Sequence, residues 1–117
     1  MRLLGTCREA EDVSILDFSG DITLGEGSAT LRKMVRELLD GGKRKILLNL
    51  AEVQYIDSAG VGELVNTFTV VRGAGGEMKI ASLTKRVHDV IQLTRLYTIF
   101  DVQPDERTAL SKFRAAP

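Results

Sequence analysis

The spacing of apolar residues in the first third of the chain predicts a pair of strands followed by a helix. Two apolar-rich runs, residues 3–8 and 13–19 (VSILDFS), predict strands, and the charged residues 9–12 between them predict a hairpin turn. Gly20 is expected to end the second strand. An amphipathic helix is then indicated by apolar side chains at every third or fourth position: Leu31, Met34, Val35, Leu38 and Leu39. Ser28 is the expected N-cap of this helix.

The remaining two thirds of the chain alternate between strand and helix patterns. The run KILLNLAEV at 45–53 is almost continuously apolar, as in a strand that is covered on both faces. Helical spacing follows at 61–71, a short strand at 77–83, a helix capped by Thr84, a strand near 99–102 and a last helix over about 105–114. This order predicts an α/β fold as a single domain over residues 1–117, with a mixed four- to five-stranded sheet and about four helices packed on it.

Composition and charge narrow the classes of function. The 117 residues carry sixteen basic and sixteen acidic side chains, and this zero net charge argues against a nucleic-acid partner. No apolar run approaches the roughly 18 residues of a membrane span, and the apolar segment at the N-terminus is too short for a signal peptide. With one cysteine, Cys7, and one histidine, His88, we expect no metal site, no cofactor and no catalytic triad. These features predict a cytoplasmic, non-enzymatic module.

The segment Asp57-Ser58-Ala59-Gly60 stands where the buried strand passes into the next helix. Ligands and reactive groups of open α/β sheets gather at this edge. One interpretation makes Ser58 an N-cap, worth about 1 kcal/mol, with Gly60 packed against the sheet. The other makes Ser58 a phosphorylation site, because a phosphate would meet the unpaired N–H groups of the helix start while Asp57 repels it. On that second interpretation, Gly60 leaves room for a partner or a kinase.

The segment LLNLAEVQYIDSAGVGEL, residues 47–64, resembles the central motif of the STAS family, the bacterial anti-sigma factor antagonists. In that family a strand leads to Asp-Ser-Ser/Ala-Gly-Leu/Val-Gly at the head of a helix. LDFSGDIT, residues 16–23, is similar to the family's second strand and its Gly-Glu-Leu-Asp turn. Thr23 stands here where the family usually has the aspartate of that turn, and Asp21 where it often has glutamate. The similarity extends over nearly the whole chain.

The resemblance implies a partner-switching mechanism. An unphosphorylated antagonist of this family binds an anti-sigma factor serine kinase, which frees a sigma factor. The kinase then phosphorylates the motif serine with ATP and releases the antagonist, and a PP2C-type phosphatase resets the cycle. Carried over to this chain, Ser58 is the phosphoacceptor, with Asp57, Ala59 and Gly60 beside it in the partner contact. The loop from residue 21 to 28, including Asp21 and Thr23, forms the adjacent part of the docking face.

Three alternative interpretations compete with this mechanism. A two-component receiver domain is rejected, because its acidic pair after the first strand and its lysine after the fifth are missing. Two non-enzymatic roles of the same fold stay open. One is a scaffold subunit of a larger signalling complex, in which phosphorylation of Ser58 controls the release of a different partner. The other is a STAS subunit of a lipid-transport ABC system, in which Ser58 caps its helix and is not phosphorylated.

Overall fold

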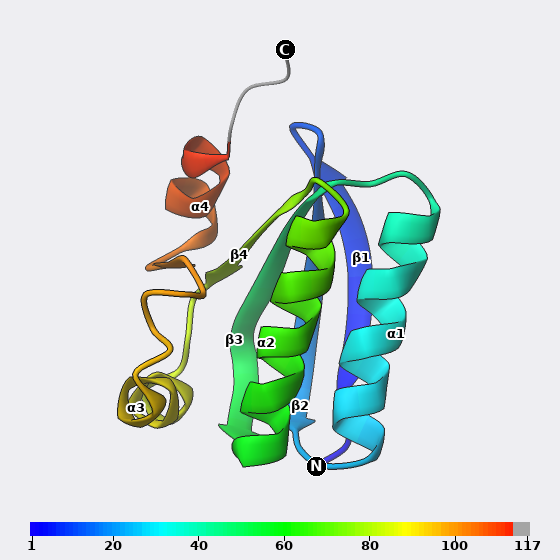
Figure 1. Cartoon of the computed structure of the whole chain (residues 1–117). Coiled ribbons are helices and arrows are strands. Elements are labelled where there is room, and N and C mark those ends of the chain that lie inside the picture. The colour runs from blue at the N-terminus through cyan, green and yellow to red at the C-terminus, as the bar shows by residue number, and fades with distance from the viewer. Residues whose placement is uncertain (114–117) are drawn as a thin grey trace.

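The computed structural model describes residues 1–113, which form one five-stranded sheet with four helices (Figure 1). The spatial order of the strands is β1-β2-β3-β4-β5. Their bounds are Leu4–Ala10 for β1, Val13–Ile22 for β2, Lys45–Ile56 for β3, Glu77–Ala81 for β4 and Val102–Gln103 for β5. β1 is antiparallel to β2, and all other neighbouring pairs are parallel. The α/β class, the mixed sheet and the order of elements predicted from the sequence are confirmed.

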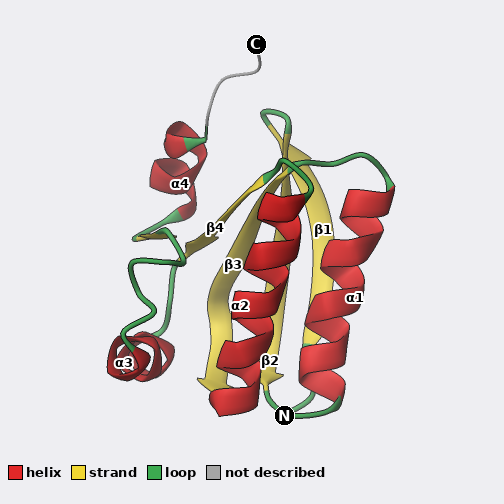
Figure 2. Ribbon diagram, in the orientation of Figure 1, coloured by secondary structure: helices red, strands yellow, loops and turns green. Residues whose placement is uncertain are grey.

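The helices lie on both faces of the sheet (Figure 2). They are α1 (Glu26–Asp40), α2 (Ser58–Gly73), α3 (Lys85–Thr94) and α4 (Glu106–Lys112). Each of the three parallel crossovers moves one strand further in the same direction. Because such crossovers are right-handed, α1, α2 and α3 all pack on one face, and α4 packs on the other. α1 and α2 lie side by side and start at the same end of the sheet (Figure 1).

Both faces of the central strand are buried, as the apolar run in its sequence predicts. Ile46, Leu48 and Leu50 of β3 belong to the large core beneath α1, α2 and α3. Leu47 points to the other face, where a second core of buried residues lies under α4: Val13, Ile15, Leu47, Ala81 and Ala109. The alternation of strand side chains therefore supplies both cores from the same strands.

The β1–β2 hairpin is tighter than the predicted turn over residues 9–12. Its turn consists of Glu11 and Asp12 alone, with φ values of 52° and 65°. Positive φ at both central residues is the type I′ geometry that matches the twist of two-residue hairpins. β2 also does not end at Gly20 but continues to Ile22, because its parallel pairing with β3 persists to Ile56.

Several predicted helix and strand ends are corrected. Ser28 does not cap α1, which starts after Gly25; its hydroxyl lies inside the first turn and donates to the Thr23 carbonyl at 2.9 Å. Thr84 does cap α3, accepting from the Val87 amide at 3.3 Å. The last strand lies at 102–103 rather than 99–102, since residues 97–101 form turns. α4 ends at Lys112, and the end predicted at 114 falls outside the described residues.

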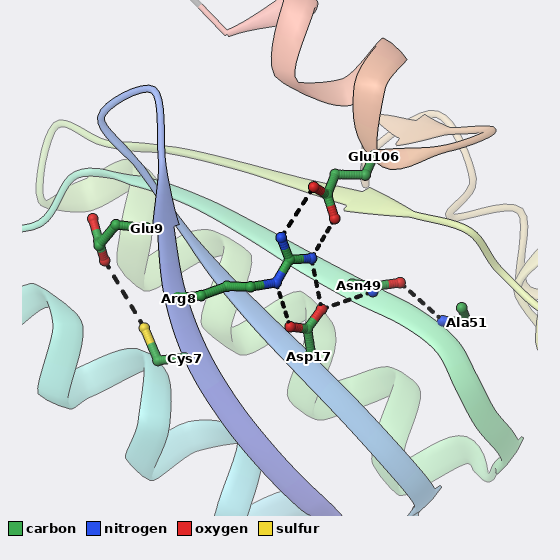
Figure 3. Close-up of polar contacts among 7 residues, drawn as sticks. All are labelled: Cys7, Arg8, Glu9, Asp17, Asn49, Ala51 and Glu106. Carbon is green, nitrogen blue, oxygen red and sulfur yellow. Dashed lines mark hydrogen bonds and ion pairs between the residues drawn. The ribbon is translucent and has the colours of Figure 1, made fainter.

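A polar network on the α4 face connects the first three strands to α4 (Figure 3). Arg8 of β1 donates through Nε to Asp17 Oδ2 of β2 at 2.6 Å, and its guanidinium also pairs with Glu106 of α4. Asn49 of β3 donates to the other Asp17 oxygen at 2.7 Å. The Arg8 guanidinium is the main cause that holds the pKa of Asp17 below its usual range. The network thus fixes α4 over the strands by charge as well as by apolar contact.

Candidate functional site

The start of α2 is capped by Asp57 and not by Ser58. Asp57 directly follows β3 in extended conformation, and its Oδ1 accepts from the Gly60 amide at 2.7 Å. Ser58 is the first residue of the helix, and its side chain is exposed. Its hydroxyl forms no hydrogen bond with any described residue. The interpretation of Ser58 as an N-cap is therefore wrong, and the hydroxyl is free at the helix N-terminus.

Asp57 also fastens the β2–α1 loop to the start of α2. Its second oxygen, Oδ2, accepts from the Leu24 amide at 3.1 Å. Its own amide donates to the Ile22 carbonyl at 3.3 Å. One partly buried carboxylate thus satisfies N–H groups in two segments that are more than thirty positions apart in the sequence. Asp57 acts as a brace that fixes the helix start against the loop.

The two glycines of the motif have different surroundings. A Cβ on Gly60 would lie 2.0 Å from the Ile22 carbonyl oxygen and 2.8 Å from Ile56 Cγ1, so only glycine allows α2 to approach β2 this closely. A Cβ on Gly62 would meet no atom within 4 Å. Gly60 therefore serves the packing of helix on sheet, as the first interpretation of the motif expects, and its role in leaving room for a partner stays a prediction. Gly62 is exposed, and because glycine has no side chain, nothing projects from this position beside Ser58.

The remaining predicted site residues lie in the adjoining loop. Asp21 pairs with the amino group of Met1, and the Thr23 carbonyl accepts from both the amide and the hydroxyl of Ser28. Both side chains are partly buried. Asp21 and Thr23 also line a shallow surface pocket of about 290 Å³, together with residues of the N-terminus and of the start of α1. The structure thus brings the loop and the Ser58 segment together through Asp57, as the predicted docking face requires.

Two exposed apolar side chains lie beside this segment: Leu24 belongs to the loop predicted as part of the docking face, whereas Tyr55 was not predicted as a site residue. Leu24, whose amide Asp57 holds, is 79% exposed, and Tyr55, near the end of β3, is 43% exposed. Tyr55 is the register partner of Asp21. A sequence signal existed for both. Leu24 is an apolar residue within the loop DITLGEG, and Tyr55 falls between the core positions Val53 and Ile56.

A charged contact between the two helices holds α2 beside α1. Glu63 of α2 is buried, and its Oε1 pairs with Arg32 Nη1 of α1 at 2.6 Å. Its other oxygen accepts from Asn66 at 2.9 Å. Because Arg32 is 45% exposed at its side chain, this pair keeps contact with solvent on one side. The two helix N-termini are thus held in a fixed lateral arrangement around the motif.

The chemistry of the site is that of an exposed hydroxyl at a helix N-terminus, with the carboxylate of Asp57 beside it. The N-terminus of a helix carries about half a positive charge, and Ser58 stands in its first turn. No described side chain is hydrogen-bonded to its hydroxyl as a base; the single histidine, His88, lies on α3 and packs edge-on against Tyr97 at 5.3 Å. The described residues also contain no group of three His, Cys, Asp or Glu side chains that could hold a metal ion. The arrangement suits Ser58 to accept a group.

None of the helices within residues 1–113 has the length and apolarity needed to cross a membrane.

Fold and site together define a small mixed-sheet domain that presents a free serine at the start of its second helix. A family model described as the STAS domain matches residues 6–109, and the chain belongs to the STAS domain family.

The relatives of the chain are named as regulators. It is 31% identical over 102 residues to a Thermotoga neapolitana protein provisionally assigned as an anti-sigma factor antagonist, covering 87% of this chain and 90% of that protein. It is 30% identical to the anti-sigma-B factor antagonist of Bacillus subtilis, covering 74% of this chain and 78% of that one. The crystal structure of a provisionally assigned anti-sigma factor antagonist from Thermotoga maritima matches with a TM-score of 0.86 at 28% identity, covering 95% of both chains.

Proposed function

We propose that this protein is an anti-sigma factor antagonist whose face around Ser58 binds an anti-sigma factor serine kinase, and that phosphorylation of Ser58 ends the binding. The observation that carries the proposal is the exposed, unbonded hydroxyl of Ser58 on a helix start that Asp57 holds in place. Relatives named as antagonists support the regulatory role. In this role the protein is regulatory and not catalytic.

The phosphate would act through charge on a surface that is already built. A phosphoserine carries about 1.5 to 2 negative charges at neutral pH. The helix N-terminus stabilises this charge in the free protein, so that α2 stays folded. In a complex the same charge would lie next to Asp57 and beside the exposed side chain of Leu24. Burying it there without a cation costs several kcal/mol, and 1.4 kcal/mol already weakens binding tenfold.

The proposed docking face consists of the Ser58 segment and the loop over residues 21–28. Leu24 supplies its exposed apolar contact, while Asp21 and Thr23 flank it at the surface pocket. A PP2C-type phosphatase would restore the hydroxyl, which is accessible to it on the exposed side of the helix start. Because the kinase uses ATP, the cycle would take place in the cytoplasm.

The experiment compares Ser58→Ala and Ser58→Asp as baits in a native lysate, with mass spectrometry of the retained proteins. We expect a kinase-fold protein on the alanine bait and its loss from the aspartate bait. Ser111→Asp, which adds the same charge at an exposed position of α4, is the control and should retain the partner. Both Ser58 variants should unfold within a few degrees of the parent, since the hydroxyl has no structural bond.

Retention of the same partners by both Ser58 baits would contradict the phosphorylation switch. If the retained partner were a transporter ATPase, the chain would act as a subunit of a lipid-transport system. A fall of the unfolding midpoint by more than about 4 °C in Ser58→Ala, equivalent to roughly 1 kcal/mol, would instead give the serine a structural role.

A further inference from the structure

α4 covers only half of the sheet face on which it packs. Its first residue, Glu106, pairs with Arg8 of β1, and the second core lies beneath it. It stands at the end of the sheet opposite to the starts of α1 and α2 (Figure 1). None of the described helices lies over the remaining half, near the carboxyl ends of β2 and β3. This uncovered half presents the side chains of Leu4, Ser19, Asp21, Glu52 and Tyr55.

Leu4 and Glu52 lie level with one another on the uncovered half. Arg8 pairs with α4, and Leu4 lies four positions earlier in β1, so their side chains point to the same face. Ser19 is the register partner of both Leu4 and Glu52. Leu4 is 59% exposed, and Glu52 is exposed and forms no ion pair with any described residue. An apolar side chain and a free carboxylate therefore stand side by side in solvent.

Tyr55 connects the uncovered half to the proposed docking face. It is the register partner of Asp21, which lies two positions after Ser19 in β2 and so points to the same face of the sheet. Asp21 lines the surface pocket to which Leu24 also belongs. Two residues after Tyr55, Asp57 accepts from the Leu24 amide. The uncovered half and the docking face thus form one continuous surface around the carboxyl edge of the sheet.

Large apolar side chains are exposed mainly at this edge. Of the six exposed ones in the described part of the chain, four lie here: Met1, Leu4, Leu24 and Tyr55. Met1 is held there because its carbonyl accepts from the Asp21 amide at 3.1 Å. The other two, Leu93 and Ile99, belong to α3 and to the turn after it. Single exposed apolar side chains are ordinary, whereas a group of them within a polar rim marks an interaction site.

We propose that the partner which binds the Ser58 face also covers the uncovered half, with an apolar surface that carries a basic side chain opposite Glu52. This inference rests on the proposed antagonist function and adds the chemistry of the partner's surface. Burial of Tyr55 and Leu4 supplies the apolar contact, and tyrosines are frequent hot spots of interfaces. Glu52 lies four residues before the end of β3, on the face opposite α2. A cation opposite Glu52 is therefore remote from Ser58 and does not neutralise a phosphate there.

The first test is photo-cross-linking in native lysate, with p-benzoylphenylalanine in place of Tyr55, Leu24 or Leu93 in the full Ser58→Ala chain. We expect the Tyr55 and Leu24 probes to capture the same kinase-fold protein, and the same probes in Ser58→Asp to lose it. The Leu93 probe is the matched control, because Leu93 is 84% exposed but lies on α3. It should not capture that protein.

The second test measures the affinity of the captured protein, once purified, by isothermal titration calorimetry against the Ser58→Ala chain. Tyr55→Ser and Leu4→Ser should each weaken binding about tenfold, whereas Leu93→Ser should leave it unchanged. Glu52→Lys should weaken binding about three- to tenfold, and more at low than at high salt. Its control is Glu37→Lys, which makes the same change at an exposed position of α1. Circular dichroism checks that each variant is folded.

Capture by the Leu24 probe without capture by the Tyr55 probe would overturn this inference, because the partner would then stop at the edge of the sheet. Full affinity in Tyr55→Ser, Leu4→Ser and Glu52→Lys would also overturn it, and so would a cross-link from Tyr55 to a second copy of the chain. In each case loss of the partner from Ser58→Asp would still support the antagonist function. Capture by both probes that persists in Ser58→Asp would support the shared surface and contradict the phosphorylation switch.

Discussion

Replacing Gly60 by alanine is expected to force the start of α2 away from β2. The new Cβ would lie 2.0 Å from the Ile22 carbonyl oxygen, whereas real Cβ contacts are essentially never below 3.0 Å. The helix start must therefore move by at least the difference, about 1 Å, against a backbone atom that cannot rotate away. The same movement disturbs the bond between the Gly60 amide and Asp57.

The cost follows from three opposing contributions. Overpacking of this kind costs about 1–3 kcal/mol. Misalignment of the N-cap costs about another 1 kcal/mol. Alanine regains about 1 kcal/mol of helix propensity, so the net loss in free energy of unfolding is about 1–3 kcal/mol. For a domain of this size that corresponds to a fall of about 4–12 °C in the unfolding midpoint.

Gly62→Ala is the matched control, because the same change of residue occurs in the same helix turn but in open space. At this position only the difference in helix propensity between glycine and alanine remains. We therefore expect the free energy of unfolding to rise by up to about 1 kcal/mol and the unfolding midpoint to rise by a few degrees. Urea and thermal denaturation of both variants measure the difference. If Gly60→Ala were as stable as the parent, the close approach of α2 to β2 would be refuted as the reason for glycine at this position.

Two further predictions concern the acidic residues of the site and of the α4 face. Asp57→Ser should keep the N-cap but be too short to reach the Leu24 amide, whereas Asp57→Ala should lose both bonds and about 1–2 kcal/mol. Amide exchange of Leu24 should quicken in both variants, and an unchanged rate would show that the brace does not hold the loop. Arg8 lowers the pKa of Asp17, so their pair contributes stability above the ordinary aspartate pKa of about 3.9 and loses it as the pH falls through the lowered value. Asp17→Asn should therefore be less stable than the parent at pH 7, and the two proteins should approach the same stability in acid. Urea denaturation of both proteins across the pH range measures this. A difference in free energy of unfolding that does not change with pH would contradict the prediction.

Periodicity was enough to predict the elements of the fold. The apolar stripe of α1 is buried at Leu31 and Val35, and the run that predicts β3 is buried on both faces. These patterns are local and strong, and a shift by one residue would expose the whole stripe or strand. The short last strand was misplaced, because two residues at the sheet edge carry little pattern of their own.

The details of the site depended on contacts between distant segments. Asp57 and Ser58 are both good capping residues, and only the continuation of β3 to Ile56 decides that Asp57 takes the cap. The role of Gly60 depends on β2 continuing past Gly20 to Ile22, whose carbonyl lies against the helix. The sequence pattern could not show these contacts, since they form between strands and helices far apart in the chain.

Because the Asp57 carboxylate accepts hydrogen bonds from both the helix start and the loop, the backbone around Ser58 is already ordered in the folded protein. An enzyme that acts on a flexible peptide must pay about 1–2 kcal/mol of backbone entropy for each residue it immobilises. Here folding has met that cost, because the loop and the helix start are locked together before any encounter. An enzyme acting on Ser58 would therefore recognise a folded shape, and an isolated peptide of residues 54–65 would be a poor substrate. Any change that loosens this helix start would slow modification even with the serine and its neighbours intact.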